Sequence, residues 1–308
     1  GFYKQHSNDI IPFDICYIQN NESNLLVKRV KELLEDVKEK PYNKETHTGN
    51  IKHILVKYGY HTNELMLIFI TYKKRIQKIN YIIRKLTDEF KQLKTIVQNI
   101  NIRHDNVILG EDINVLYGDG YIEDILLGNK YQISTHSFYQ VNPIQVEHLY
   151  SKAIEYAKLE KTDHVIDAYC GIGTISLSMA KSVEKVYGVE IVEQAIIDAK
   201  NNALRNNISN VEFVCQDPGD FMVDFAKRNI NIDVVMVDPP RKGCSQLFLD
   251  QLLTLGPKKV VYISCDVATQ ARDIKYLQAK GYKAEFCQPV DMFPQSYHVE
   301  TVCLLSRR

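Results

Sequence analysis

The residue best suited to covalent chemistry in this sequence is Cys265. It follows the apolar, β-branched run Val260–Ser264, which is typical of a strand buried in a parallel sheet. Ligands of open α/β sheets bind at the carboxyl ends of the strands, so a thiol placed there can act on a bound molecule. A lone cysteine at a strand end is more often a structural residue. The carboxylates of Asp238 and Glu300, expected nearby, favour instead a nucleophile with a base beside it.

A second motif points to a nucleoside cofactor. The segment Asp167-Ala-Tyr-Cys-Gly-Ile-Gly-Thr174 follows an expected strand and precedes a helix, and its glycines allow a tight turn close to a ligand. Glu190 ends the next strand, where an acid can accept ribose hydroxyls, and Asp217 follows the third strand, where it can accept an adenine amine. The motif lacks the third glycine of the pyrophosphate fingerprint, which favours S-adenosylmethionine over NAD.

The loop Asp238-Pro-Pro-Arg241 is expected directly after the fourth strand, where the prolines fix φ and hold Asp238 rigidly at the cofactor. Similar loops serve amino methyltransferases, which use no cysteine, so this motif alone leaves the methyl acceptor open. A thiol is needed when the acceptor is C5 of a pyrimidine, which has no lone pair, because addition of Cys265 to C6 of a uracil makes C5 a nucleophile. Glu300 is then the candidate base that removes the C5 proton and allows the thiol to leave.

Strands and helices are expected to alternate through the second half of the chain. A helix should begin at Asn142-Pro143, since proline suits a first helical turn. The expected strands are residues 164–168, 185–189, 211–215, 233–237 and 259–264. This alternation predicts a doubly wound parallel sheet. Residues 283–288 and 300–306 leave no room for a helix between them, which predicts an antiparallel hairpin at the sheet edge, as in methyltransferases.

The predicted fold class is therefore α/β, with two domains. A Rossmann-like, S-adenosylmethionine-dependent methyltransferase domain is expected over residues 135–308, preceded by a smaller mixed α/β domain over residues 1–134. In the smaller domain the expected helices are residues 25–40 and 76–92, and the expected strands are residues 51–58 and 64–72 with short pieces between 106 and 127.

Composition limits the function classes. The net charge is zero, with 38 Lys and Arg and 38 Asp and Glu in the whole chain. Residues 1–110 hold 18 of the basic and 12 of the acidic residues, so residues 111–308 hold 20 basic and 26 acidic residues. The basic excess includes Lys73-Lys-Arg75, which is either a solvated surface or a phosphate contact. No apolar run approaches the ~20 residues of a membrane helix, so no membrane association is expected. Seven scattered cysteines favour a reducing cytoplasm, and the start without Met or signal pattern predicts a fragment or processed chain.

Five segments together resemble the RNA (uracil-5-)methyltransferases, which form 5-methyluridine in transfer and ribosomal RNA. They occur in the family's order and are residues 133–142 (ISTHSFYQVN), 167–174 (DAYCGIGT), 238–244 (DPPRKGC), 264–273 (SCDVATQARD) and 291–302 (DMFPQSYHVETV). The resemblance implies S-adenosylmethionine as cofactor and an RNA loop with a flipped-out uridine as substrate. The enzyme is expected to be a monomer.

Carried over by position, the resemblance assigns roles to individual residues. It makes Cys265 the nucleophile and Glu300 the base. The implied cofactor contacts are Gln140, Tyr169, Glu190 and Asp238, with Asp217 a weaker addition. Thr174 stands where some relatives have Asn, so that contact stays open.

The start of the chain resembles the beginning of the family's central domain, and the resemblance implies that residues 1–134 form this central domain and contact RNA. In ribosomal members, Cys16 would be the last of four cysteines that hold a [4Fe–4S] cluster, and the other three would lie upstream with an OB-like RNA-binding domain. One cysteine cannot hold a cluster, so we expect no intact metal site in this chain, although a full-length parent could carry one. Cys16 also favours ribosomal RNA, with 23S as the expected molecule, over transfer RNA.

Three alternatives remain open at this stage. The first is a transfer-RNA uracil-5 methyltransferase. The second is an amino methyltransferase that uses the Asp-Pro-Pro motif, with Cys265 structural. The third is a non-enzymatic RNA-binding fragment that is inactive without an N-terminal domain.

Overall fold

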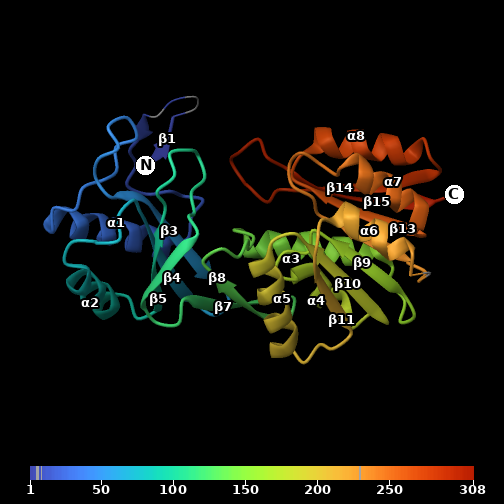
Figure 1. The fold of residues 1–308 in the computed structure, drawn as a ribbon, viewed down its shortest axis with the longest axis horizontal. Coiled ribbons are helices and arrows are strands. Elements are labelled where there is room, and N and C mark those ends of the chain that lie inside the picture. Colours follow the sequence, from blue (N-terminus) through green and yellow to red (C-terminus); the bar gives the residue numbers. More distant parts are fainter. Residues whose placement is uncertain (5–6, 8, 229) are drawn as a thin grey trace. The chain divides into compact units, whose positions relative to one another are not determined.

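The chain divides into two compact units, Gly1–Asp124 and Ile125–Arg308 (Figure 1). The computed structural model describes residues 1–4, 7, 9–228 and 230–308. Each unit has its own principal sheet and its own hydrophobic core. Within these described residues, every helix is too short or too polar to cross a membrane.

The second unit contains a seven-stranded sheet in the order β11-β10-β9-β12-β13-β15-β14. Its strands are β9 (His164–Ala168), β10 (Lys185–Glu190), β11 (Val211–Cys215), β12 (Val234–Val237), β13 (Lys259–Ser264), β14 (Tyr282–Val290) and β15 (Glu300–Arg307). The first five in chain order are parallel, and β15 pairs antiparallel with both β13 and β14. The doubly wound sheet and the terminal antiparallel hairpin are confirmed, with β14 at the edge.

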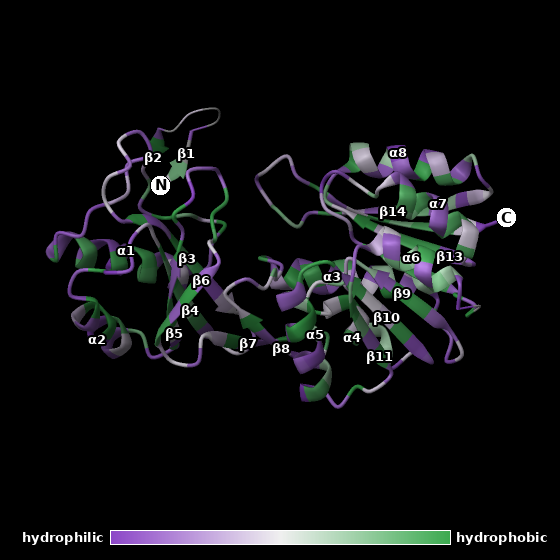
Figure 2. Ribbon diagram, viewed as in Figure 1, coloured by the Kyte–Doolittle hydropathy of each residue, from purple (hydrophilic) through white to green (hydrophobic). Residues whose placement is uncertain are grey.

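Helices cover two cores formed by alternate residues of these strands. The helices are α3 (Pro143–Ala157), α4 (Thr174–Ala180), α5 (Glu193–Arg205), α6 (Pro218–Ala226), α7 (Gln246–Leu255) and α8 (Val267–Gln278). In β13, Val261 and Ile263 join the core of α3, α4 and α5, whereas Val260 and Tyr262 join the core of α6, α7 and α8. This period of two buries both sides of the strand. Figure 2 shows helices such as α8 with alternating hydrophilic and hydrophobic residues, as expected for helices with one buried face.

The first unit contains a four-stranded sheet in the order β3-β4-β5-β6. Its elements are β1 (Phe2–Tyr3), β2 (Ile10–Ile11), α1 (Asn21–Asp36), β3 (Ile51–Gly59), β4 (Glu64–Thr71), α2 (Ile79–Glu89), β5 (Leu93–Ile100) and β6 (Asp112–Tyr117). Both predicted helices and the β3–β4 pair are confirmed. Strand β5 was not predicted because Gln98 and Asn99 interrupt its apolar pattern. Both are buried, but they are hydrogen-bonded to Thr71 and Gly110.

A two-stranded sheet of β7 (Tyr121–Leu126) and β8 (Asn129–Ser134) contains the division between the units. Strand β8 is anchored to α5 of the second unit. The amide of Lys130 donates to Asn206 Oδ1 at 2.8 Å, and the amide of Gln132 donates to Asn202 Oδ1 at 2.8 Å. Residues 125–134 therefore belong with the second unit, and the division lies before the boundary at 134–135 expected from the sequence.

We expect Leu252→Ala to lower the free energy of unfolding of the second unit by about 2–5 kcal/mol, because it leaves a cavity in the core. Leu252 on α7 is fully buried. Urea unfolding of the transition assigned to this unit measures the change. The matched control is Leu204→Ala on α5, where the side chain is 76% exposed and a change within about 0.5 kcal/mol is expected. Equal effects of the two substitutions would contradict this placement of α7.

Candidate active site

The candidate site lies at the carboxyl ends of β9 and β12, where the strand order reverses. The loop after β9 contains Gly171 with φ +53° and Gly173 with φ +84°. A Cβ on Gly171 would meet no atom within 4 Å, so the space above it is open to a ligand. A Cβ on Gly173 would lie 2.7 Å from the Phe213 ring, so this position needs glycine for packing. The loop thus leaves room for a bound molecule at one glycine and packs closely at the other.

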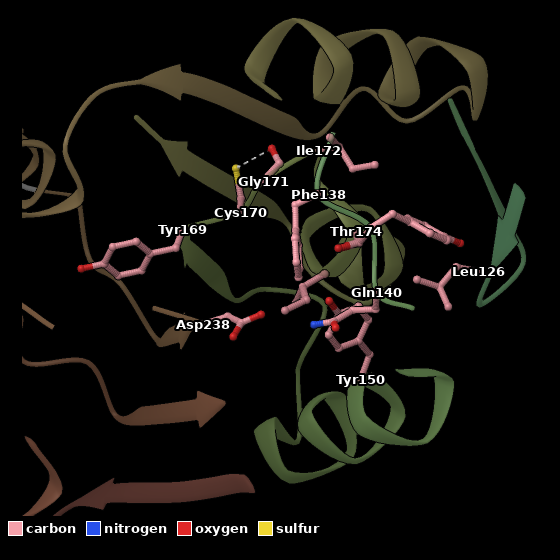
Figure 3. A pocket seen from close by; sticks show the side chains of 12 residues that line it. Leu126, Phe138, Gln140, Tyr150, Tyr169, Cys170, Gly171, Ile172, Thr174 and Asp238 are labelled. Carbon is pink, nitrogen blue, oxygen red and sulfur yellow. Dashed lines mark hydrogen bonds between the residues drawn. The ribbon is translucent and has the colours of Figure 1, made fainter. Parts of the chain in front are cut away.

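This loop forms one wall of the pocket shown in Figure 3. Three of the predicted cofactor contacts, Gln140, Tyr169 and Asp238, line it, and so does Thr174. The pocket is lined by Leu126, Phe138, Tyr139, Gln140, Tyr150, Tyr169, Cys170, Gly171, Ile172, Thr174, Ile175 and Asp238. All of these residues belong to the second unit, so this unit builds the pocket from its own elements.

Tyr150 is a pocket residue that sequence reasoning missed. It lies on α3 and lines the pocket together with Thr174 and Gln140. Burial raises the pKa of Tyr150, so the hydroxyl stays protonated and can donate. In the sequence it shares the helical spacing of Leu149 and Ala153, both buried, which predicts only a core position.

Tyr169 has an unusual backbone conformation. Its φ of +66° lies in the left-handed region. This conformation is unfavourable for a non-glycine residue and persists where contacts with the surrounding structure hold it, often at functional sites. Its ring centroid lies 5.8 Å from that of Phe248, and Figure 3 shows its hydroxyl pointing away from Gln140. The side chain therefore contributes to the core of α6, α7 and α8 as well as to the pocket wall.

Glu190 and Asp217 are not among the residues that line this pocket. Glu190 ends β10, and its carboxylate accepts hydrogen bonds from the amides of Gly171 at 3.3 Å and Ile191 at 2.8 Å. It therefore helps to hold the glycine loop. Asp217 caps α6, where its Oδ1 accepts from the amide of Gly219 at 2.8 Å. One of its two oxygens is thus occupied by the helix cap.

Cys265 and Glu300 meet at the junction of β13 and β15. Ser264 pairs with Thr301 in this antiparallel ladder, so the next residues along the two strands, Cys265 and Glu300, lie side by side. Thr301 Oγ1 donates to Gln270 Oε1 at 2.6 Å, and Gln270 Nε2 donates to the Tyr262 carbonyl at 3.0 Å. These bonds lock the strand ends that carry the thiol and the carboxyl group.

Burial sets the protonation of this cluster. Burial raises the pKa of Glu300 to about 7, and the charge of Arg241 opposes the shift. Burial, followed by the charges of Glu300 and Asp167, raises the pKa of Asp238 well above its usual range. Burial, with the charges of Glu300 and Asp238, also raises the pKa of Cys265. The resting thiol is protonated at neutral pH and must lose its proton before it acts as a nucleophile.

Arg241 brings a positive charge to this cluster. Its backbone carbonyl accepts a hydrogen bond from α8. Thr269 Oγ1 donates to that carbonyl at 3.0 Å, and Arg272 Nη2 donates to the Lys242 carbonyl at 3.0 Å. The amide of Cys244 donates to Asp273 Oδ2 at 2.9 Å. Sequence reasoning placed Arg241 in its motif but gave it no role. The sequence signal for a role was that Arg241 directly follows Asp-Pro-Pro after β12, the strand that pairs with β13, which Cys265 follows.

The expected remnant of a metal site lies in the first unit. Cys16 is half-buried, and its amide and carbonyl are hydrogen-bonded to the Asn24 side chain. Within residues 1–4, 7, 9–228 and 230–308, no group of three or more His, Cys, Asp or Glu side chains is placed to hold a metal ion.

Comparison with known proteins places this geometry in a family. Residues 17–308 match the family model described as tRNA (uracil-5-)-methyltransferase. An uncharacterized RNA methyltransferase of Bacillus cereus is 47% identical over 307 residues, which cover 100% of this chain and 67% of the relative. One of Streptococcus mutans is 45% identical over 99% of this chain and 68% of the relative. The chain thus spans about two thirds of the length of these relatives.

A solved structure is similar over almost the whole chain. It is the Pyrococcus abyssi tRNA (uracil-54, C5)-methyltransferase in complex with S-adenosyl-L-homocysteine, with a TM-score of 0.81 and 29% identity. The match covers 96% of this chain and 70% of that one. The resemblance, the fold class, the enzyme class and the methyl-donor cofactor predicted from the sequence are confirmed.

The raised pKa of Glu300 predicts a pH-dependent effect of Glu300→Gln on stability. The folded carboxyl group keeps its proton up to about pH 7, whereas the unfolded one loses it near the ordinary glutamate pKa of 4.5. Ionisation therefore destabilises the folded wild-type chain progressively between these values, and glutamine avoids this loss. We expect the free energy of unfolding of the variant, relative to wild type, to increase by about 1–3 kcal/mol from about pH 5 to about pH 8.

Urea unfolding at the two pH values measures this difference. Glu155→Gln on α3 is the control, since that side chain is 61% exposed and should show no comparable increase. An equal increase in both variants would contradict the effect of burial at Glu300.

Proposed function

Because the chain belongs to the tRNA (uracil-5-)-methyltransferase family, we propose that it methylates C5 of a specific uridine in RNA with S-adenosylmethionine as donor. The observation that carries the proposal is the placement of Cys265 beside Glu300 at the ligand edge of the sheet. A thiol and a carboxyl group are the two side chains that methylation of C5 requires. The predicted substrate is an RNA loop from which the uridine flips out of the stack.

In this proposal Cys265 is the nucleophile. Its thiol transfers its proton to a neighbouring group, and the thiolate forms a bond to C6 of the uracil. The electron pair of the C5–C6 double bond is then delocalised over C5 and the C4 carbonyl, which makes C5 a carbon nucleophile. Arg241 supports the thiolate, because its charge lowers the pKa of Cys265 against the effect of burial.

Glu300 is the proposed base that completes the reaction. After methylation, C5 carries both a proton and the new methyl group. Removal of that proton by Glu300 restores the C5–C6 double bond and breaks the bond between Cys265 and C6. A carboxyl group whose pKa burial raises to about 7 is suited to this task, since it is partly ionised at neutral pH and holds the proton well.

Gln140, Tyr169, Glu190 and Asp238 are the proposed cofactor contacts, with Asp217 a weaker one. S-adenosylmethionine supplies an electrophilic methyl group when it is bound. The open space above Gly171 fits such a ligand, and Glu190 lies directly behind this loop, where it can reach a ribose. Asp217 has one oxygen in a helix cap, which leaves the other for an adenine amine.

The proposed substrate is ribosomal RNA, with a 23S site first, because Cys16 corresponds to a cluster ligand of the ribosomal members. Transfer RNA is the alternative, supported by the description of the family model and by the substrate named for the Pyrococcus abyssi enzyme. Mass spectrometry of nucleosides from each RNA of cells lacking the gene separates the two. Loss of 5-methyluridine from transfer RNA alone would overturn the ribosomal assignment. We also propose a cytoplasmic monomer.

The amino methyltransferase alternative gives Cys265 no task. The pairing of β13 with β15 argues against it, because a structural cysteine needs no carboxyl group at its side. Labelled methyl on cytosine or adenine, with none on uracil, would establish that alternative. RNA binding without turnover by the purified chain would establish the inactive-fragment alternative.

Cys265→Ala should reduce methyl transfer to RNA by at least about 10³-fold, because the carbon nucleophile no longer forms. Binding of S-adenosylmethionine, measured by calorimetry, should remain within a few-fold of wild type. Cys215→Ala is the matched control, since Cys215 is an exposed cysteine outside the pocket and its loss should leave turnover unchanged. Undiminished turnover of the Cys265 variant would exclude the covalent mechanism.

Glu300→Gln should trap a covalent RNA–protein adduct, because addition and methylation proceed while proton removal fails. Denaturing gel electrophoresis with labelled RNA detects the adduct, and mass spectrometry identifies Cys265 as the attached residue. The double variant Cys265→Ala/Glu300→Gln is the control and should form none. Absence of any adduct with an otherwise folded Glu300 variant would overturn the role of Glu300.

A further inference from the structure

The first unit contains a pocket that the proposed reaction does not use. It lies between the turn that precedes β3 and the loop that follows β5, and it encloses about 240 Å³. One water molecule occupies about 30 Å³, so the space is far larger than a hydration site. The residues that matter for its chemistry are Tyr42, Lys44, His47, Lys52, Arg103 and His104.

One side of this pocket is aromatic. The Tyr42 hydroxyl hydrogen-bonds with His47 Nδ1 at 2.7 Å and with His104 Nδ1 at 3.1 Å. The rings of His47 and His104 lie 4.1 Å apart, edge to face, and the Tyr42 ring lies 5.0 Å from that of Tyr72. The two histidines are exposed on loops more than fifty positions apart in the chain. Such exposed rings are the usual platform for an unpaired nucleobase.

The other side of the pocket is cationic. Lys52 Nζ lies 5.1 Å from the centroid of the Tyr42 ring and donates to the Arg103 carbonyl at 2.6 Å. Burial lowers the pKa of Lys52, and the positive charge of Lys44 lowers it further. Arg103 pairs with Asp105, so among the residues that line the pocket three cations face one carboxylate. An anion placed between these side chains would offset the repulsion between Lys44 and Lys52.

A basic run continues from the aromatic side. Lys73-Lys-Arg75 directly follows Tyr72 and is exposed. The Asn50 side chain fixes this turn, because it accepts from the Lys73 amide at 2.8 Å and donates to the Arg75 carbonyl at 2.9 Å. The structure thus joins the basic segment noted in the sequence to the ring cluster through Tyr72.

We propose that this pocket binds one nucleotide of single-stranded RNA, with the base stacked on Tyr42 and His104 and the phosphate held by Lys44 and Arg103. The proposal rests on the proposed function in one respect, that RNA is the substrate. The bound nucleotide is a second contact, separate from the reacting uridine, because every pocket residue belongs to the first unit. Its role is affinity for the RNA strand and not chemistry.

Two variants and a matched control test the pocket. Lys44→Ala/Arg103→Ala removes two cations that line it, and Arg84→Ala/Lys85→Ala removes two cations of the same unit that lie on α2. Binding of a short fluorescein-labelled single-stranded RNA to the whole chain is followed by anisotropy over a range of salt. The pocket variant should bind about 10-fold more weakly, and its log–log salt slope should fall by about 0.7, the value for one phosphate contact on a single strand, since the two cations hold one phosphate. The control should stay within about 2-fold of wild type.

His104→Ala tests the stacking side of the pocket. It should weaken binding by about 5-fold or more while leaving the salt slope unchanged, because stacking releases no counterions. With methylation as readout, both pocket variants should raise KM for RNA and leave kcat unchanged. In the unmodified chain, bound RNA should protect His47 and His104 from diethyl pyrocarbonate.

The outcomes separate this proposal from the proposed function. Affinities of both pocket variants equal to the control, or no protection of His47 and His104, would overturn the pocket. Equal protection of these histidines by millimolar inorganic phosphate alone, without RNA, would identify a simple anion site and also overturn the proposal. Wild-type RNA binding that depends on the pocket, without any 5-methyluridine formed, would instead be a failure of the proposed function alone.

Discussion

The antiparallel insertion of β15 between β13 and β14 is the constraint on which the geometry of the proposed catalytic pair depends. Parallel strand β13 ends at the ligand edge of the sheet, and β15 starts at that edge because it runs in the opposite direction. The residue that follows β13 and the first residue of β15 can therefore face the same ligand, and these are Cys265 and Glu300. A parallel strand in the place of β15 would present its carboxyl end there, and a base would have to come from a more mobile loop.

Burial of acidic groups around this edge lowers the free energy of unfolding of the protein without its ligand. Burial raises the pKa of Asp167 to about 7, against the hydrogen bond from Ser176, and within the described part of the chain Asp167 Oδ1 has no hydrogen-bond partner. The pKa values of Asp238 and Glu300 are raised in the same way, with Arg241 the cation that acts on Glu300. Such a cluster is stabilised by a ligand that brings positive charge, and S-adenosylmethionine carries a sulfonium and an ammonium group. The unsatisfied part of the fold thus coincides with the part that we propose binds the cofactor.

The spacing of apolar residues along the chain was sufficient to predict the elements whose residues are close in sequence. The five parallel strands and the juxtaposition of Cys265 with Glu300 follow from periodicity and from the rule that ligands bind at strand ends. Tyr150 could not be recognised, because its helical spacing is that of a core residue. The placement of Arg241 depends on Thr269 and Arg272 of α8, which no spacing within residues 238–244 reveals. Strand β5 was missed because the partners that satisfy its polar residues are distant in the chain.

The distribution of charge explains why one chain needs two kinds of binding surface. Three carboxyl groups gather at the catalytic edge with the guanidinium of Arg241, so this edge offers little attraction to a polyanion. Residues 1–110 carry the basic excess, with 18 Lys and Arg against 12 Asp and Glu. In the proposed function, the basic residues of the first unit supply binding energy for the phosphate backbone, and the carboxyl groups of the second unit do not. Contacts of this kind lower KM, whereas only the groups that touch the uracil can accelerate the chemical step.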